Sequence, residues 1–301
     1  MSGSPSIDAA WRAHRPYLVN LAYQMLGDIG GAEDVAQEAF LRLARTDAGQ
    51  IDDFRAWLTV VAGRLCLDQI RSARVRREYT DDFGALETAI SPDLEPADRV
   101  TLDDDVRAAL LEVLRRLSPG ERVAFVLHDV FQLPFVEIAE TVGRPVGTCR
   151  QLARRARAKF ADASPRLAEV GDVEHQLVTE KFITACANGD LQALTAILDP
   201  TVWGAGTIIG DGAPPPQINH GPHDVAVNLL RYLGQGATLV SGPVGQPAVL
   251  AFTNRRLFAV LVFTLRDNMI LKIEASVDPS AAMPDGRAEG SPAPGERGLP
   301  S

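Results

Sequence analysis

The chain has 301 residues, 46% of them hydrophobic and 23% charged, with a formal net charge of −9. This length exceeds one compact helical domain, so we expect two or three domains with apolar cores. Its three cysteines, Cys66, Cys149 and Cys186, are too far apart for a disulfide framework or paired zinc ligands. No leader-like start and no run of about 18 apolar residues occurs, so we expect a soluble protein of the reducing cytoplasm without a membrane partner.

Charge is distributed unevenly along the chain. Basic residues gather at 64–77 and 144–166, whereas 81–105 carries nine acidic residues and one arginine. The field that a phosphate backbone experiences is set by local charge. The negative total therefore does not exclude nucleic-acid binding.

The first third of the chain has the apolar spacing of helices. Helices are predicted at 8–26, 31–45 and 53–79, and the third becomes basic toward its end. Three glycines are expected to interrupt the pattern between the first two: Gly27, Gly30 and Gly31. Trp57 is expected in the core, because it shares a stripe with other large apolar residues of the third helix.

An acidic linker follows at 81–105, where prolines interrupt any helix. Helical spacing resumes at 106–117. Ser118 then suits an N-cap and Pro119 the first position of a helix that reaches about residue 131.

Residues 135–160 predict two short helices joined by a tight turn. Gly143 stands at the reversal, where a positive φ costs glycine least, and Pro145 suits the first turn of the second helix. Cys149 and Leu152 face the first helix, which leaves the arginines for other faces. From Arg144 to Arg166 there are seven basic residues and one acid. A cationic second helix on this scaffold is a major-groove reader; the alternative is a solvated arginine-rich helix of an ordinary bundle.

Beyond residue 171 the pattern changes. A helix, a turn at 188–190 and a second short helix are predicted within 172–198. Strands are predicted at 202–209, 248–253, 257–265 and 269–276, with a helix at 224–233. Helices followed by several antiparallel strands indicate an α+β domain.

Three segments of the first half resemble an extracytoplasmic-function (ECF) sigma factor of bacterial RNA polymerase. GAEDVAQEAFLRLAR (31–45) resembles the helix of sigma region 2 that docks on the polymerase clamp. FRAWLTVVAGRLCLDQIRSARVRRE (54–78) resembles the adjoining part that melts and captures the −10 element, although Arg64 stands where many members carry Asn. Residues 117–160 resemble region 4, which reads the −35 element.

The C-terminal part is similar to another family. DVEHQLVTEKFITACANGDLQALTAILDPTVW (172–203) resembles the opening of SnoaL-like domains, which have the cone-shaped nuclear-transport-factor-2-like fold. Sigma factors with this appendage form the sigma factor J group. SPDLEP (91–96), IGDGAPPP (209–216) and SVDPSAAM (276–283) resemble that group's motifs only in part.

The resemblance implies a multidomain chain: two all-α sigma domains followed by an α+β SnoaL-like cone domain. The expected boundaries are 1–80 for region 2, 81–105 for the linker, 106–168 for region 4, 169–278 for the SnoaL-like domain and 279–301 for a disordered tail.

The candidate site residues fall into groups. Arginine and glutamine make bidentate contacts to base edges, and residues at a helix start contact phosphate. The −35 candidates are Arg144, Thr148, Arg150, Gln151, Arg154 and Arg155. The −10 candidates are Arg64, Arg71, Arg74 and Arg77. The resemblance nominates four polymerase-docking residues: Asp34, Gln37, Glu38 and Arg42.

For the C-terminal domain three roles stay open: catalysis, small-ligand sensing, and an autoregulatory interaction surface, which we favour. The candidates for a regulatory pocket are Trp203, Asp211, His220 and His223. Two histidines in a Pro/Gly loop are a weak metal signal, so neither a metal nor a cofactor is expected.

The sequence thus predicts a non-enzymatic promoter-specificity subunit, with core RNA polymerase, promoter DNA and a small molecule of the C-terminal domain as candidate partners. The first alternative is a one-component, ligand-responsive helix-turn-helix regulator, which has no use for the 31–79 segment. The second is a SnoaL-type enzyme with a DNA-binding arm, which needs a base in a pocket.

Overall fold

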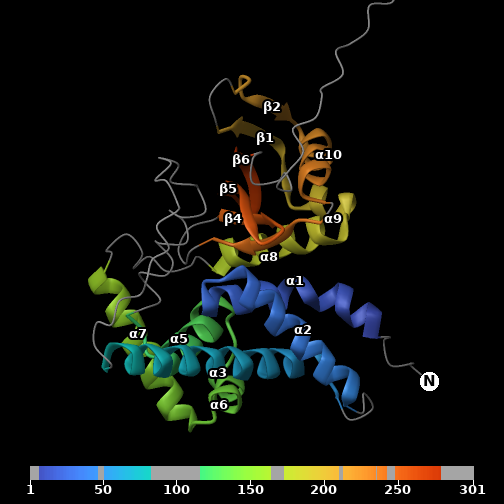
Figure 1. The fold of residues 1–301 in the computed structure, drawn as a ribbon. Coiled ribbons are helices and arrows are strands. Elements are labelled where there is room, and N and C mark those ends of the chain that lie inside the picture. Colours follow the sequence, from blue (N-terminus) through green and yellow to red (C-terminus); the bar gives the residue numbers. More distant parts are fainter. Residues whose placement is uncertain are drawn as a thin grey trace, which may run out of the picture.

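The computed structural model describes residues 7–46, 51–82, 116–163, 173–209, 213–234, 236–242 and 248–278. The helices of the first half are α1 (Ile7–Leu26), α2 (Ile29–Arg45), α3 (Phe54–Asp82), α5 (Pro119–Phe125), η2 (Val126–Val130), α6 (Phe135–Val142) and α7 (Val146–Ala163). They form a helical layer beneath an α+β unit (Figure 1). None of the described helices combines the length and hydropathy needed to cross a bilayer.

The second half contains both helices and strands. Its helices are α8 (Val173–Asn188), α9 (Leu191–Ala196) and α10 (Pro222–Leu233). Its strands are β1 (Leu198–Ile208), β2 (Gln217–His220), β3 (Thr238–Ser241), β4 (Ala248–Thr253), β5 (Arg256–Arg266) and β6 (Met269–Val277). The expected α+β class is confirmed. The sequence patterns missed β2 and β3, which have four residues each.

Within the described residues the strands form a six-stranded sheet in the order β2-β1-β6-β5-β4-β3. The expectation of antiparallel strands is wrong for one pair, because β1 runs parallel to β6. Along the chain, β1 and β6 are separated by β2, α10 and the strands β3–β5. The two strands are nevertheless neighbours in the sheet and run in the same direction. One face of the sheet packs on α8, α9 and α10 around a core that includes Phe182, Leu261 and Phe263.

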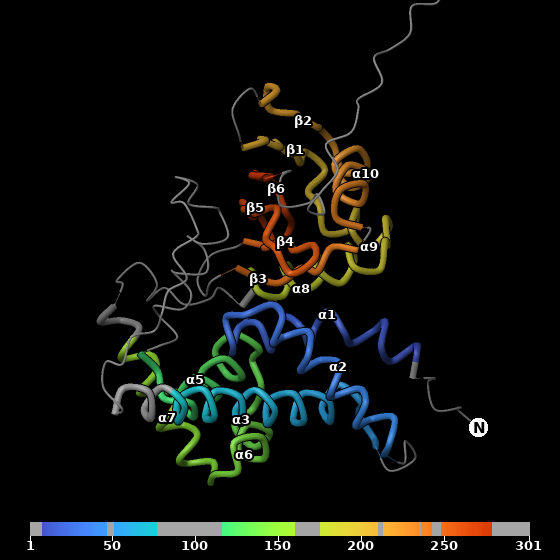
Figure 2. Tube along the Cα trace, viewed as in Figure 1, coloured from blue at the N-terminus to red at the C-terminus, as the bar shows by residue number. Residues whose placement is uncertain are grey.

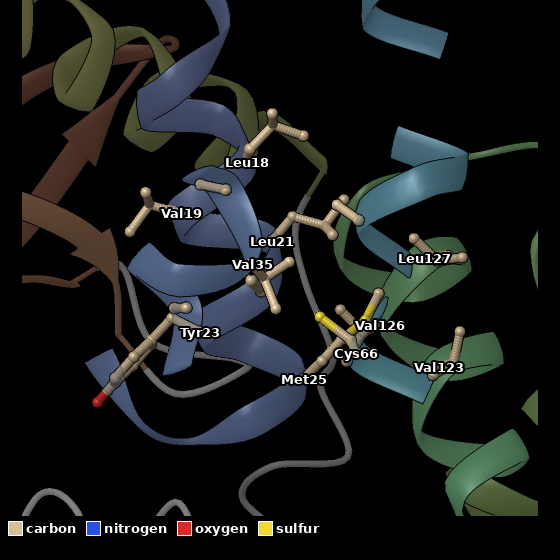
Figure 3. Close-up of a cluster of buried hydrophobic side chains, with 14 of the residues drawn as sticks. Leu18, Val19, Leu21, Tyr23, Met25, Val35, Cys66, Val123, Val126 and Leu127 are labelled. Atoms are coloured by element: carbon tan, nitrogen blue, oxygen red, sulfur yellow. The ribbon is translucent and has the colours of Figure 1, made fainter. Parts of the chain in front are cut away.

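α1 is buried on all sides near its C-terminal end. The nine residues from Tyr17 to Met25 are all buried, although two of them are polar. Leu21 and Met25 point toward α3 and η2, whereas Tyr23 points to the opposite side of α1 (Figure 3). A helix that is buried all round belongs to the centre of a structure. α1 is therefore packed between the other helices of the first half and the sheet.

The start of α2 corrects the sequence prediction. Only Gly27 breaks the helical pattern, with a φ of 69°, whereas Gly30 and Gly31 lie inside the first turn of α2. Asp28 is the N-cap, and its Oδ2 accepts a hydrogen bond from the Gly31 amide at 2.7 Å. The cap satisfies an amide that the helix itself cannot pair, which explains how a helix begins at a glycine-rich segment.

The helix predicted to run continuously to residue 131 also differs from expectation. Ser118 is the N-cap of α5 and Pro119 stands at its first position, as the sequence predicts, and the Glu121 side chain completes a capping box that was not predicted. The second half of the segment is the π-helix η2, closed by a hydrogen bond from the Phe131 amide to the Val126 carbonyl at 3.1 Å. A π-turn holds an extra residue per turn, and it places Phe131 against the ring of Tyr17 in α1.

One hydrophobic core links all of these parts. It contains residues of α1, α2 and α3, of the helices α5–α7, and of the sheet face that α8–α10 leave uncovered, including Val240, Leu250 and Phe252. In Figure 2 the sheet lies above α1, and α3 and α6 lie below that helix. The two predicted promoter-binding segments and the C-terminal domain are thus packed as one body.

Candidate nucleic-acid interface

The helix-turn-helix is formed by α6, α7 and the turn between them. Gly143 has a φ of 67°, as its place at the reversal predicts. The amides of Gly143 and Arg144 both donate to the Ala139 carbonyl, at 3.0 and 3.3 Å. The Pro145 carbonyl then accepts from the amides of Thr148 and Cys149 at 2.9 and 3.1 Å, which starts α7. Local chemistry alone therefore fixes the angle at which α7 leaves α6.

α7 divides into a buried face and a cationic face. Cys149, Ala153 and Ala156 are fully buried against the core. The six −35 candidates are all exposed: Arg144, Thr148, Arg150, Gln151, Arg154 and Arg155. Thr148, Gln151 and Arg155 follow one line along the helix at spacings of three and four residues, Arg150 and Arg154 lie beside that line, and Arg144 precedes the helix. This row has the length and chemistry of a base-reading surface.

Two other basic residues of α7 are held by the protein itself. Nε of Arg157 lies 2.6 Å from Oδ1 of Asp129, and Nζ of Lys159 lies 2.6 Å from Oε2 of Glu121. Both acids come from the α5–η2 segment, on the side of α7 away from the exposed row. These pairs fasten the helix to the α5–η2 segment, whereas Thr148, Arg150, Gln151, Arg154 and Arg155 are exposed on α7.

The two acids differ in their electrostatics. Burial raises the pKa of Asp129, and Arg157 offsets only part of this effect. Its Oδ2 is buried without a hydrogen-bond partner. For Glu121 burial also acts upward, but hydrogen bonds from Lys159 and the Ser118 amide lower the pKa overall. The charged form of Asp129 is thus stabilised mainly by Arg157, whereas that of Glu121 is stabilised by both Lys159 and Ser118.

The −10 candidates lie on the surface of α3. Arg64, Arg71 and Arg74 are exposed, whereas the side chain of Arg77 lies outside the described residues. Arg64 Nη2 donates to the Glu140 carbonyl of α6 at 2.9 Å. Trp57 is partly buried and packs against the core, which agrees with its predicted structural role. The end of α3 therefore carries cationic side chains, but Arg64 is already engaged by the helix-turn-helix.

The polymerase-docking candidates lie on the outer face of α2. Asp34, Gln37 and Arg42 are exposed, and Glu38 is partly exposed and pairs with Arg42 at 2.9 Å. Asp34 is not open to solvent on all sides, because Nη2 of Arg255 lies 2.8 Å from its Oδ1. A residue of the C-terminal domain therefore contacts the predicted docking face.

The sequence analysis missed a polar interface between α1 and the sheet edge. Oδ1 of Asn20 accepts from the Ser241 amide and hydroxyl, both at 2.8 Å. Nε2 of Gln24 donates to the Ser241 carbonyl at 2.7 Å. Nearby, Thr238 Oγ1 donates to Oε1 of Glu33 at 2.9 Å. Asn20 and Gln24 are polar residues four positions apart within an apolar run. Because buried polar groups are hydrogen-bonded, this spacing could have indicated that α1 buries a second face against a polar partner.

The candidate residues of the C-terminal domain do not all lie together. Trp203 and His220 are opposite each other on β1 and β2, and Nζ of Lys272 lies 4.8 Å from the Trp203 ring centroid. His223 is exposed in the first turn of α10, and Asp211 lies outside the described residues. Among the residues that the structure describes, no three His, Cys, Asp or Glu side chains are placed to hold a metal ion.

Two family models match the first half of the chain, and a relative matches nearly all of it. Residues 10–76 match the family model for sigma-70 region 2, and residues 107–160 match the model for sigma-70 region 4. A probable ECF RNA polymerase sigma factor, SigI of Mycobacterium tuberculosis, is 51% identical over 288 residues, covering 94% of this chain and 97% of the relative.

Two solved structures are similar in part. The crystal structure of the ECF sigma factor SigJ of M. tuberculosis is 30% identical, covers 90% of this chain and 96% of its own, and has a TM-score of 0.36. An NTF2-like protein of Burkholderia xenovorans is 19% identical, covers 37% of this chain and 95% of its own, and has a TM-score of 0.25.

Proposed function

Because the chain belongs to the ECF sigma factors of bacterial RNA polymerase, which are non-enzymatic initiation factors, we propose a role for each of its surfaces. α7 reads the −35 element as duplex, and the basic end of α3 contacts the −10 element as a melted strand. The outer face of α2 docks on core polymerase. The C-terminal domain is a built-in regulator without catalytic activity, and the whole chain acts with the polymerase in the cytoplasm.

The observation that carries the −35 assignment is the split of basic residues on α7. Arg157 and Lys159 are neutralised by acids of the protein itself, whereas Arg150, Arg154 and Arg155 face outward beside Gln151. Arginine binds guanine edges and glutamine binds adenine edges bidentately in the major groove. Internal ion pairs thus leave uncovered the side chains that suit base recognition.

The described arrangement represents a closed state of this sigma factor. The −35 and −10 elements are centred about 25 base pairs apart, which corresponds to about 85 Å of B-form duplex at about 3.4 Å per base pair. In the structure α3 and α6 are in direct contact, with Arg64 bonded to the Glu140 carbonyl. α3 and α7 cannot reach both elements while they share one core. Promoter binding therefore requires the helix-turn-helix to leave α3.

The regulatory role of the C-terminal domain is supported by what it touches. Its sheet packs on α1, and Glu180 of α8 pairs with Arg55 of α3 at 2.6 Å. The domain thus contacts α1 and α3, and Gln176 of α8 also donates to the Asp129 carbonyl of η2 at 3.1 Å. A domain so placed can control how readily the sigma regions separate.

The docking assignment is tested by charge reversal. Asp34→Arg with Glu38→Arg is expected to abolish co-purification with core polymerase, because the outer face of α2 becomes basic. Asp8→Arg with Asp224→Arg is the matched control, since both of these carboxylates are exposed on other helices. Retention of polymerase by the first variant would place the docking face elsewhere.

A further inference from the structure

Arg255 reaches from the C-terminal domain onto the first turns of α2. Its Nη2 lies 2.8 Å from Oδ1 of Asp34, and its Nε lies 3.4 Å from Oε2 of Glu33. The side chain runs over Gly30, where an added Cβ would fall 3.1 Å from Nη1. Glycine at position 30 therefore leaves room for the guanidinium between two acids.

The backbone at Arg255 is unusual for this residue type. Asn254 and Arg255 form the two-residue turn between β4 and β5, with φ values of 49° and 64°. Such turns favour Asn-Gly, because the second position also needs a left-handed conformation. A residue whose backbone conformation is strained is a candidate for a role outside its own turn.

The hairpin at the other end of β5 shows the contrast. Its turn residues, Asp267 and Asn268, also have positive φ values of 50° and 62°. Asp and Asn tolerate this conformation, since their short polar side chains bond locally. Arginine lacks that compensation. Arg255 is thus the residue whose placement turn chemistry alone does not explain.

Arg255 lies at the margin of an interface that other contacts hold. The interior of the interface is formed by the Asn20–Ser241 hydrogen bonds and the Tyr23–Phe252 ring contact at 5.5 Å. The Arg255 side chain keeps 54% of its surface exposed. An exposed ion pair adds little to stability. Its position is more informative, because it neutralises an acid of the proposed docking face.

We propose that Asp34, beside a Glu33 that Arg15 and Thr238 also engage, forms a docking site for a basic group, which Arg255 occupies in the closed chain and a basic side chain of core RNA polymerase occupies in the holoenzyme. This inference rests on the proposed docking role of α2. Arg255 then acts as a competitive latch: polymerase must displace it, and its release removes the ion pair between the C-terminal domain and Asp34, while Thr238 still donates to Glu33.

The test uses Arg255→Gly in the full chain. Glycine suits the turn, so the variant removes the guanidinium without straining the hairpin. Asn268→Gly is the matched control, because it makes the same kind of change in the other hairpin. Affinity for core polymerase is measured by fluorescence titration. Hydrogen exchange of the amides at 29–35 reports separately on the contact with α2.

The latch predicts about two- to fivefold tighter binding of polymerase by Arg255→Gly, with Asn268→Gly equal to the unaltered chain. Faster exchange at 29–35 is expected in the first variant alone. Unchanged or weaker polymerase binding by Arg255→Gly would overturn the latch. So would unchanged exchange at 29–35, even if the docking assignment holds. Full polymerase binding by Asp34→Arg would instead contradict the proposed function of α2.

Discussion

Gly63 of α3 and Thr141 of α6 are in such close contact that a Cβ added to Gly63 would fall 2.5 Å from Cγ2 of Thr141. Thr141 is 3% exposed, and its hydroxyl donates to the Glu137 carbonyl at 3.2 Å. This contact sets how closely the helix-turn-helix approaches α3. It also offers a way to open the closed state without changing a residue that we propose to contact DNA.

Gly63→Ala is expected to separate the helix-turn-helix from α3, because no real Cβ is found so close to another atom. Alanine also has a higher helix propensity than glycine, which should stabilise α3 itself by up to about 1 kcal/mol. The variant should therefore keep its helical circular dichroism while the distance between labels on α3 and α7 increases. Promoter binding by the holoenzyme should rise, since less of the closed state has to be disrupted.

The second-site variant Thr141→Ser keeps the hydroxyl and removes the methyl group that Gly63→Ala would strike. Combined with Gly63→Ala, it should restore the short distance between the labels. A label distance in Gly63→Ala that equals that of the unaltered chain would show that the contact does not control closure.

Arg155→Ala is expected to weaken promoter binding by about 1–3 kcal/mol if Arg155 reads a base edge. The loss should depend on the identity of one −35 base pair, which binding to altered promoters would reveal. Lys159→Ala is the matched control, because it removes the same charge from the same helix at a position paired with Glu121. Equal losses for the two variants at every promoter would argue for a general charge effect only.

Arg157→Ala should destabilise the helix-turn-helix in a pH-dependent manner. Burial already raises the pKa of Asp129 above its ordinary value of 3.8, and loss of Arg157 raises it further. A carboxyl whose pKa is higher in the folded state favours folding when protonated, so stability falls as the pH rises through that pKa. We expect the free energy of unfolding to fall by about 1–2 kcal/mol at pH 7, because the largely buried Asp129 loses its partner. The loss is not larger, because that partner, Arg157, is half exposed.

Chemical denaturation at pH 4.5 and 7 measures this effect, and the loss should be smaller at the lower pH, where Asp129 is more protonated. In an Asp129→Asn background, the stability lost on Arg157→Ala should be the same at both pH values. An Arg157→Ala loss that is equal at both pH values would mean that Asp129 is not the group responsible.

Asn20→Leu should weaken the attachment of the C-terminal domain to α1. The change leaves the Ser241 amide without its acceptor, at an expected cost of about 1–3 kcal/mol. Limited proteolysis should then release the C-terminal domain more readily, while the helical part stays intact. Unchanged proteolysis would show that apolar packing at Phe252 holds the domains together without this bond.

The parts of the fold that local patterns determine were predictable from the sequence. Gly143, the Ser118 N-cap and Pro119 act within a few residues, and the structure confirms each, whereas Pro145 lies one residue before α7 and not in its first turn. The parallel pairing of β1 with β6 and the short strand β3 depend on distant partners, which periodicity does not record. Asp28 was available as a cap, but the neighbouring glycines suggested a break.

The candidate site was predictable only in part for a similar physical reason. The exposed row on α7 follows from helical spacing, so the residue types and their face could be read directly. Whether Arg64 and Asp34 are available depends on Glu140 and Arg255, which come from other parts of the chain. Their roles in binding stay predictions until they are measured.

The central claim is that this chain selects transcription start sites through two surfaces that the closed structure holds together. In vitro transcription of genomic DNA, with core polymerase and the full chain, followed by sequencing of transcript 5′ ends, tests it most directly. The account predicts start sites that share one −35 and one −10 element at constant spacing, and a loss of these sites with Arg155→Ala. Transcripts whose start sites are the same with and without the chain would contradict it.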